Sequence, residues 1–160
     1  MRATRREKGR WKANGLLRAV CAIAVFVGVP PVAKAQDAHV VLRILDGRNG
    51  KPLVNQRLLV FAGKTLEAVR QHENKFELVT GKNGMADLRI PSPEIKQIQV
   101  WVDFRVLCQS KPNTRSFSIA KILSKGVSTP NECGPQRVQP APGQFIVFAR
   151  PSHFWEKMRR

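Results

Sequence analysis

The sequence has few of the residues from which catalytic and metal sites are built. It contains three histidines, His39, His72 and His153, and no two of them have the spacing of metal ligands. The nucleophile motif G-x-S-x-G and the calcium-binding run D-x-D-x-D-G are both absent. We therefore expect the three histidines to be surface residues. We also expect that the protein is not an enzyme and binds no metal or other cofactor.

Two weaker arrangements keep some chemistry open. Asp46, Asp87 and Asp103 would form a carboxylate cluster or a calcium site if their loops converged, although Asp87 falls on the solvent face of a predicted strand. The turn at residues 47–50 is too short for a phosphate-binding loop. A hydrolase with an unrecognised site is therefore the weakest function under consideration.

Long hydrophobic runs are also missing. The longest, residues 19–29, is about half the length of 20 residues that a membrane-spanning helix needs, and two prolines end it. A basic segment precedes the run, and the small-x-small cleavage site at residues 33–35 follows it. This order predicts a secretory signal peptide over residues 1–35, cleaved between Ala35 and Gln36, with a mature chain that has no transmembrane span.

Three other forms of this N-terminus compete with a cleaved signal peptide. A retained membrane anchor would need a longer apolar run. Lipid attachment at Cys21 is disfavoured because this cysteine lies inside the run and not after it. A twin-arginine signal at Arg5 and Arg6 lacks the hydrophobic residues that should follow. We therefore expect general secretion of a bacterial type, to the periplasm or outside the cell.

Acidic residues are scarce. The chain has 28 Lys and Arg against 11 Asp and Glu, a formal net charge of +17. Residues 36–160 would keep 20 basic and 10 acidic residues, a charge of +10. This excess favours an anionic glycan or lipid surface as partner. No specific nucleic-acid binding is expected, because the basic residues are scattered and no aromatic-flanked basic run appears.

Cysteine is equally rare, and only Cys108 and Cys133 would remain after the signal peptide is removed. Two cysteines in an oxidising compartment have one possible intramolecular pairing, so we predict a disulfide between them. Two free thiols or a metal pair are the alternatives. A metal pair is disfavoured because no histidine lies between them or within a few residues.

Helical periodicity is nearly absent, and short runs of strand composition dominate. The segments 75–80 and 85–90 alternate polar with apolar residues around an Asn-Gly turn, which predicts a hairpin. Residues 65–74 are expected to form a loop or a short helical turn, and residues 128–143 a loop. The predicted strands are 39–45, 57–61, 75–80, 85–90, 98–107, 116–119 with 122–123, and 144–149.

These elements predict an all-β fold, an antiparallel Ig-like or prealbumin-like sandwich of about seven strands. We expect it to occupy residues 36–150 and to be followed by an aromatic and basic C-terminal tail, residues 151–160. The antibody hallmark is missing, because Trp101 precedes both mature cysteines.

Two turn motifs resemble those of carboxypeptidase regulatory-like domains. In residues 43–56 a hydrophobic strand leads into a D-x-x-x-G-x-P-[LIV] turn, with Asp46, Gly50 and Pro52 at the marked positions. In residues 80–88, Thr80 leads into an Asn-Gly turn that ends at Gly84 and continues as a strand. The resemblance covers residues 40–102 and implies a prealbumin-like sandwich that is usually a non-catalytic accessory or surface module.

Large aromatic residues are the candidates for contact with a partner. Trp101, Phe104, Phe154 and Trp155 would suit a sugar-stacking platform, but large aromatics dominate the cores of small sandwiches. We therefore expect Phe104 in the core and Trp101 covering the opposite sheet face or an interface. Contact outside the domain is expected of the tail, through Phe154, Trp155, Lys157, Arg159 and Arg160.

Together these features predict a non-catalytic exported β-sandwich module. Its expected role is structural or protein-binding, at the cell envelope or outside the cell. The alternative is a carbohydrate- or anionic-polymer-binding module that uses the basic surface and exposed tryptophans.

Overall fold

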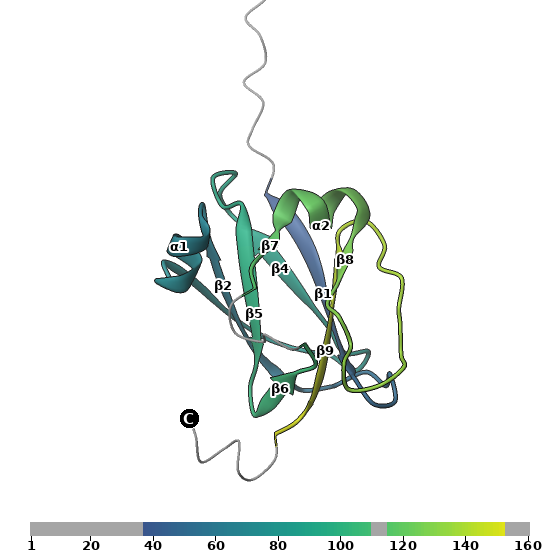
Figure 1. The fold of residues 1–160 in the computed structure, drawn as a ribbon. Coiled ribbons are helices and arrows are strands. Elements are labelled where there is room, and N and C mark those ends of the chain that lie inside the picture. The colour runs from purple at the N-terminus through teal and green to yellow at the C-terminus, as the bar shows by residue number, and fades with distance from the viewer. Residues whose placement is uncertain (1–36, 110–114, 153–160) are drawn as a thin grey trace, which may run out of the picture. The chain divides into compact units, whose positions relative to one another are not determined.

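Two β-sheets packed face to face form the fold (Figure 1). A computed structural model describes residues 37–109 and 115–152 of the chain. The predicted signal peptide and its cleavage site, Ala35 and Gln36, lie outside the described residues, as does most of the C-terminal tail.

The first sheet, called sheet A, has the strand order β4-β1-β9-β6, and β8 also pairs with β9. Its strands are β1 (Ala38–Asp46), β4 (Met85–Ile90), β6 (Arg105–Leu107), β8 (Val127–Ser128) and β9 (Gln144–Pro151). The β1–β4 and β6–β9 pairs are antiparallel, whereas β9 runs parallel to both β1 and β8.

The second sheet, called sheet B, has the order β3-β2-β5-β7 and is antiparallel throughout. Its strands are β2 (Arg57–Gly63), β3 (Asn74–Val79), β5 (Gln97–Val102) and β7 (Phe117–Ser118). Two short helices join strands, α1 (Leu66–Arg70) after β2 and α2 (Ile119–Lys125) after β7. Neither helix is long and apolar enough to cross a membrane.

Alternate residues of the strands point between the two sheets and form the main core. This is the period of two that a strand with one buried face requires. Helix α2 adds Ile119 and Ile122 to the same core. The members that are at most 1% exposed are Val40, Leu42, Ile44, Leu58, Val60, Ala62, Leu88, Ile90, Ile98, Ile122, Phe145, Val147 and Ala149.

The predicted all-β sandwich is confirmed, with differences in detail. The described residues contain nine strands, two of which, β7 and β8, are only two residues long. The antiparallel prediction is wrong for β9, which runs parallel to β1 and β8. Residues 145–149 are a continuous buried apolar run, the pattern of a strand covered on both faces.

Three of the predicted elements are wrong. Segments 75–80 and 85–90 do not pair as a hairpin, because β3 lies in sheet B and β4 in sheet A. The predicted strand 98–107 breaks at Asp103 and Phe104, and its halves β5 and β6 lie in different sheets. The predicted strand 122–123 lies in α2. In each case, packing between sheets overrides a local pattern that is compatible with a strand.

The two turn motifs contact each other and connect the sheets. Buried Thr80 donates its hydroxyl to the Leu53 carbonyl at 2.7 Å and accepts from the Gln56 amide at 2.9 Å. Gly84 has φ 71°, and its carbonyl accepts from the Ile44 amide at 2.8 Å. A Cβ at Gly84 would lie 2.9 Å from the Ile44 oxygen, so a side chain there would displace the turn.

The first turn motif is closed by its own hydrogen bonds. The Asp46 carboxylate accepts from the Arg48 amide at 2.8 Å, and the Asp46 carbonyl accepts from Gly50, whose φ is 72°. Pro52 then forms an isolated bridge with Leu45, which returns the chain toward β1. These contacts give Asp46, Gly50 and Pro52 a structural role in the turn.

A second, smaller apolar cluster lies on the other face of sheet A. It consists of Leu45, Cys108, Ile146 and Phe148, with Cys133 and Val138 packed against it. The predicted disulfide is present: Cys108 and Cys133 are bonded, with their Cα atoms 5.3 Å apart. This bond joins the end of β6 to the loop that leads into β9, so the loop stays over the outward side chains of β9.

Asn131 attaches the same loop to the first turn. Its amide donates to the Gly47 carbonyl at 2.8 Å and to the Gln136 carbonyl at 3.1 Å. A Cβ at Gly47 would lie 2.4 Å from the Cys108 sulfur, so only glycine allows the disulfide and this turn to meet. Asn131 itself is buried, and its hydrogen bonds offset the cost of burying its amide.

Loss of the disulfide should destabilise the fold without removing its main core. We expect the double variant Cys108→Ser, Cys133→Ser to lose about 3 kcal/mol of unfolding free energy, the loop-closure entropy of a cross-link of this span. Urea denaturation of the two proteins measures this difference. Equal stability would show that the loop is held over β9 without the bond.

Candidate functional site

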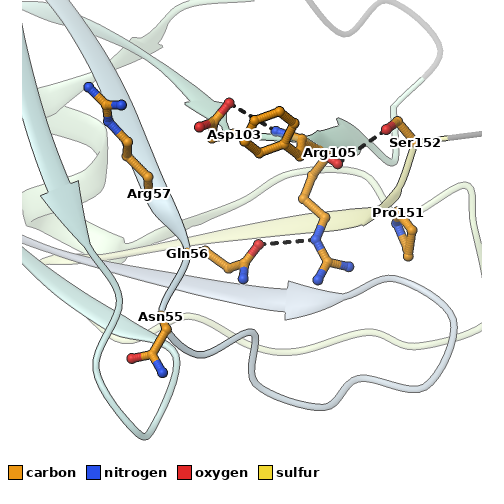
Figure 2. A pocket seen from close by; sticks show the side chains of 8 residues that line it. Asn55, Gln56, Arg57, Asp103, Arg105, Pro151 and Ser152 are labelled. Carbon is orange, nitrogen blue, oxygen red and sulfur yellow. Dashed lines mark hydrogen bonds between the residues drawn. The ribbon is translucent and has the colours of Figure 1, made fainter. Parts of the chain in front are cut away.

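An open hollow of about 440 Å³ lies where β5 turns into β6 (Figure 2). Three segments that are distant in sequence line it: the start of β2, the β5–β6 turn and the end of β9. The lining residues are Asn55, Gln56, Arg57, Asp103, Phe104, Arg105, Pro151 and Ser152.

Hydrogen bonds hold these three segments together. The Asp103 amide donates to the Arg57 carbonyl at 2.9 Å, and Arg105 Nε donates to Gln56 Oε1 at 3.1 Å. The Ser152 hydroxyl donates to the Phe104 carbonyl at 3.2 Å. Figure 2 shows the contacts of Gln56 with Arg105 and of Ser152 with the turn at the rim of the hollow. The hollow is thus built by the fold and held from three sides.

Phe104 is the most unusual residue of this site. It is 73% exposed, the highest value among the large hydrophobic residues described, and the expectation that it belongs to the core is wrong. Its φ is 54°, in the left-handed region where a bulky side chain costs about 1–2 kcal/mol. The turn after Val102 imposes this conformation and carries the ring out of the sandwich. Residues with strained backbone are found most often at ligand sites and other functional positions of proteins.

Asn55, on the opposite side of the hollow, also has a positive φ, 53°. In the described part of the chain three residues other than glycine have a positive φ, and two of them line this hollow. The third, His72, lies on the outer face of sheet B. Strained backbone is therefore concentrated at this end of the fold.

Arg57 links the hollow to the outer face of sheet B. Its guanidinium donates to Glu77 Oε2 at 2.5 Å, and Lys75 Nζ contacts the other oxygen of the same carboxylate at 2.7 Å. Hydrogen bonds from Lys75 and Arg57 lower the pKa of Glu77 to about 2. The hydrogen bond from Arg57 to Glu77 raises the pKa of Arg57, and the charge of Asp103 acts in the same direction. Glu77 and Arg57 are therefore both charged near neutral pH.

The chemistry of the hollow suits binding. Ser152 donates to a backbone carbonyl and not to a base, so its hydroxyl is not activated for nucleophilic attack. Among residues 37–109 and 115–152, no group of three His, Cys, Asp or Glu side chains is placed to hold a metal ion. An exposed ring beside guanidinium, amide and hydroxyl groups is a composition found where proteins contact partners.

The acidic cluster that the sequence left open, of Asp46, Asp87 and Asp103, does not form. Asp46 accepts from the Arg48 amide in the first turn, and Asp87 contacts His39 Nε2 at 3.0 Å on β1. Asp103 accepts from the Phe104 amide at 3.1 Å beside the hollow. The three carboxylates thus serve three separate local structures.

Of the predicted contact residues, the structure describes only Trp101. It lies on the outer face of sheet B, 37% exposed, in contact with Phe61 and His72. The other predicted contact residues lie outside the described residues: Phe154, Trp155, Lys157, Arg159 and Arg160. Of the predicted surface histidines, His39 and His72 are exposed, and His153 lies outside the described residues.

Most of the hollow carries no signal in the sequence. The polar residues that line it belong to no motif, and they meet only because β2 and β6 begin where β9 ends: Gln56, Arg57, Arg105 and Ser152. One signal was available: Asp103 is a turn-forming residue inside the apolar run 98–107. If a turn had been predicted at Asp103, Phe104 would have been expected at its exposed tip.

Comparison with protein-family models, curated proteins and solved structures found no match to this chain. The site is therefore interpreted from its own geometry.

Removal of the strained side chain should stabilise the protein. In Phe104→Gly the left-handed conformation costs nothing, while the added entropy of the unfolded chain cancels part of the gain. We expect the unfolding free energy to rise by about 0.5–1 kcal/mol in urea denaturation.

Phe104→Ala is the matched control for this experiment. It removes the ring but keeps a Cβ at positive φ, so no gain in stability is expected from it. A clear loss of stability in Phe104→Gly would instead show that the ring packs on the fold.

Proposed function

We propose that this protein is a non-catalytic exported β-sandwich module that binds a protein partner at the cell envelope or outside the cell. The observation that carries the proposal is Phe104, exposed and strained at the rim of the hollow. A ring presented in this way can enter a pocket of a partner without loss of any core contact, as the central anchors of protein interfaces do.

Several further features support this proposal. Arg57 and Arg105 flank the aromatic residue, and arginine together with aromatic residues is enriched at interfaces. The basic excess of the chain favours a partner with an acidic surface. The turns at Asp46–Pro52 and Thr80–Gly84 support a prealbumin-like module of the carboxypeptidase regulatory-like type, and such modules act as accessories to other proteins.

Site-specific photocrosslinking tests the contact. With p-benzoylphenylalanine in place of Phe104, irradiation of cells that naturally produce the protein should yield a discrete adduct with one partner. The reason is that the side chain at this position points out of the fold. The adduct is detected by a mobility shift and identified by mass spectrometry.

The same photoreactive residue in place of Arg89 is the control. Arg89 is exposed on β4 of the other sheet, away from the hollow. Identical adducts from positions 89 and 104, or none from 104, would contradict a partner site at this turn.

Export has its own test. Processing of the predicted signal peptide should leave Gln36 as the first residue of the protein recovered from the periplasm or medium. N-terminal peptide mapping by mass spectrometry identifies that residue. The disulfide supports an oxidising destination. Recovery of a chain that still begins at Met1 would overturn the proposed export.

A further inference from the structure

The outer face of sheet B carries a cluster of three rings, formed by Phe61, His72 and Trp101. Phe61 and His72 stack with their centroids 3.8 Å apart and their planes 20° apart. The indole of Trp101 lies 5.5 Å from Phe61 and 6.1 Å from His72, close to perpendicular to both, at 82° and 85°. These distances place the indole beside the stacked pair, so the edges of both rings point at one indole face.

His72 has an unusual backbone conformation for a histidine that follows the end of a helix. It follows the C-cap of α1 with a φ of 57°, where glycine is the residue that costs least. The imidazole that occupies this place supports the indole through Phe61. The cluster is therefore built at a cost in backbone conformation, although His72 and Trp101 are both exposed.

The strand register shows what the other indole face meets. Trp101 pairs with Leu59, and Phe61 pairs with Gln99, so Phe61 lies diagonally from Trp101 toward the start of β5. The indole face that Phe61 and His72 contact is therefore turned toward the start of β5. The opposite face is turned toward the end of β5, where Asp103 donates its amide to the carbonyl of Arg57. Figure 2 shows Arg57 and Asp103 at this end of the sheet.

Charged residues occupy the positions near Trp101 on the outer face of sheet B. Leu59 lies between Trp101 and Glu77 in the register of the sheet, and Arg57, two residues before Leu59, lies on the same face of β2. With Lys75 and Asp103, this face carries two cations and two carboxylates, a local charge of zero in a strongly basic chain. The surface is thus polar and rich in donors and acceptors without favouring an anion.

We propose that this face binds a neutral polysaccharide, with one pyranose ring stacked on the open face of Trp101. The apolar C–H face of the sugar covers the indole, while its hydroxyls meet Arg57, Asp103 and Glu77. Guanidinium and carboxylate groups offer paired donors and paired acceptors at the spacing of neighbouring hydroxyls. The site is independent of the protein partner proposed at Phe104, although the two surfaces adjoin at Arg57.

A panel of neutral hexasaccharides tests the proposal: cellohexaose, xylohexaose, maltohexaose and chitohexaose. Hexagalacturonate serves as the acidic control. Calorimetry with the exported protein should detect binding of at least one neutral sugar, with little dependence on salt. Trp101→Ala should weaken that binding about tenfold or more. Phe104→Ala should leave it unchanged.

Two further variants separate a binding effect from a folding effect. His72→Gly relieves the backbone at positive φ, so it should keep stability while it weakens sugar binding through the loss of indole support. Arg89→Gln removes one positive charge on the other sheet and should have no effect. The proposal fails if no neutral sugar binds, if Trp101→Ala binds as well as the parent, or if only hexagalacturonate binds and salt abolishes that binding.

Discussion

The burial of β9 on both faces is the constraint on which the rest of the fold depends. Phe145 and Val147 enter the core between the sheets, while Ile146 and Phe148 point to the other side and would be exposed on a bare sandwich. The loop before β9 covers them, and the disulfide and Asn131 hold that loop in place. The continuous apolar run of β9 and the placement of the two cysteines therefore answer the same physical need, because apolar area on a sheet face must be removed from water. Strand β9 then continues into Pro151 and Ser152, which form one side of the hollow.

The crossing from sheet B to sheet A after Val102 determines where a partner can bind. A continuous strand over residues 98–107 would have kept Phe104 on the same face as Val100 and Val102, inside the core. The turn instead gives Phe104 a left-handed backbone and an exposed ring. The same crossing brings Asp103 to Arg57, so the hollow and the outer face of sheet B become neighbouring surfaces. One local departure from strand geometry thus exposes Phe104 and makes the two surfaces to which we assign binding adjoin at Arg57.

Much of the fold could be predicted because its signals are local. The alternation in residues 85–90, the glycines at 50 and 84 and the pairing of two remaining cysteines each depend on nearby residues or on simple counting. The errors concern long-range choices. Strand composition does not say which sheet a strand joins, so β3 and β4 looked like one hairpin. The hollow was beyond prediction for the same reason, since Gln56 and Arg105, which share a hydrogen bond, are 49 positions apart.

By itself, the sequence determined the class of the fold, the positions of most strands and the disulfide, because hydrophobic period, turn residues and cysteine number act locally or without regard to topology. Only the tertiary structure decided that β9 lies parallel to β1, that Phe104 leaves the core and that Trp101 is supported by Phe61 and His72. These outcomes depend on which surfaces are buried against each other, and that competition is settled by packing of the whole domain.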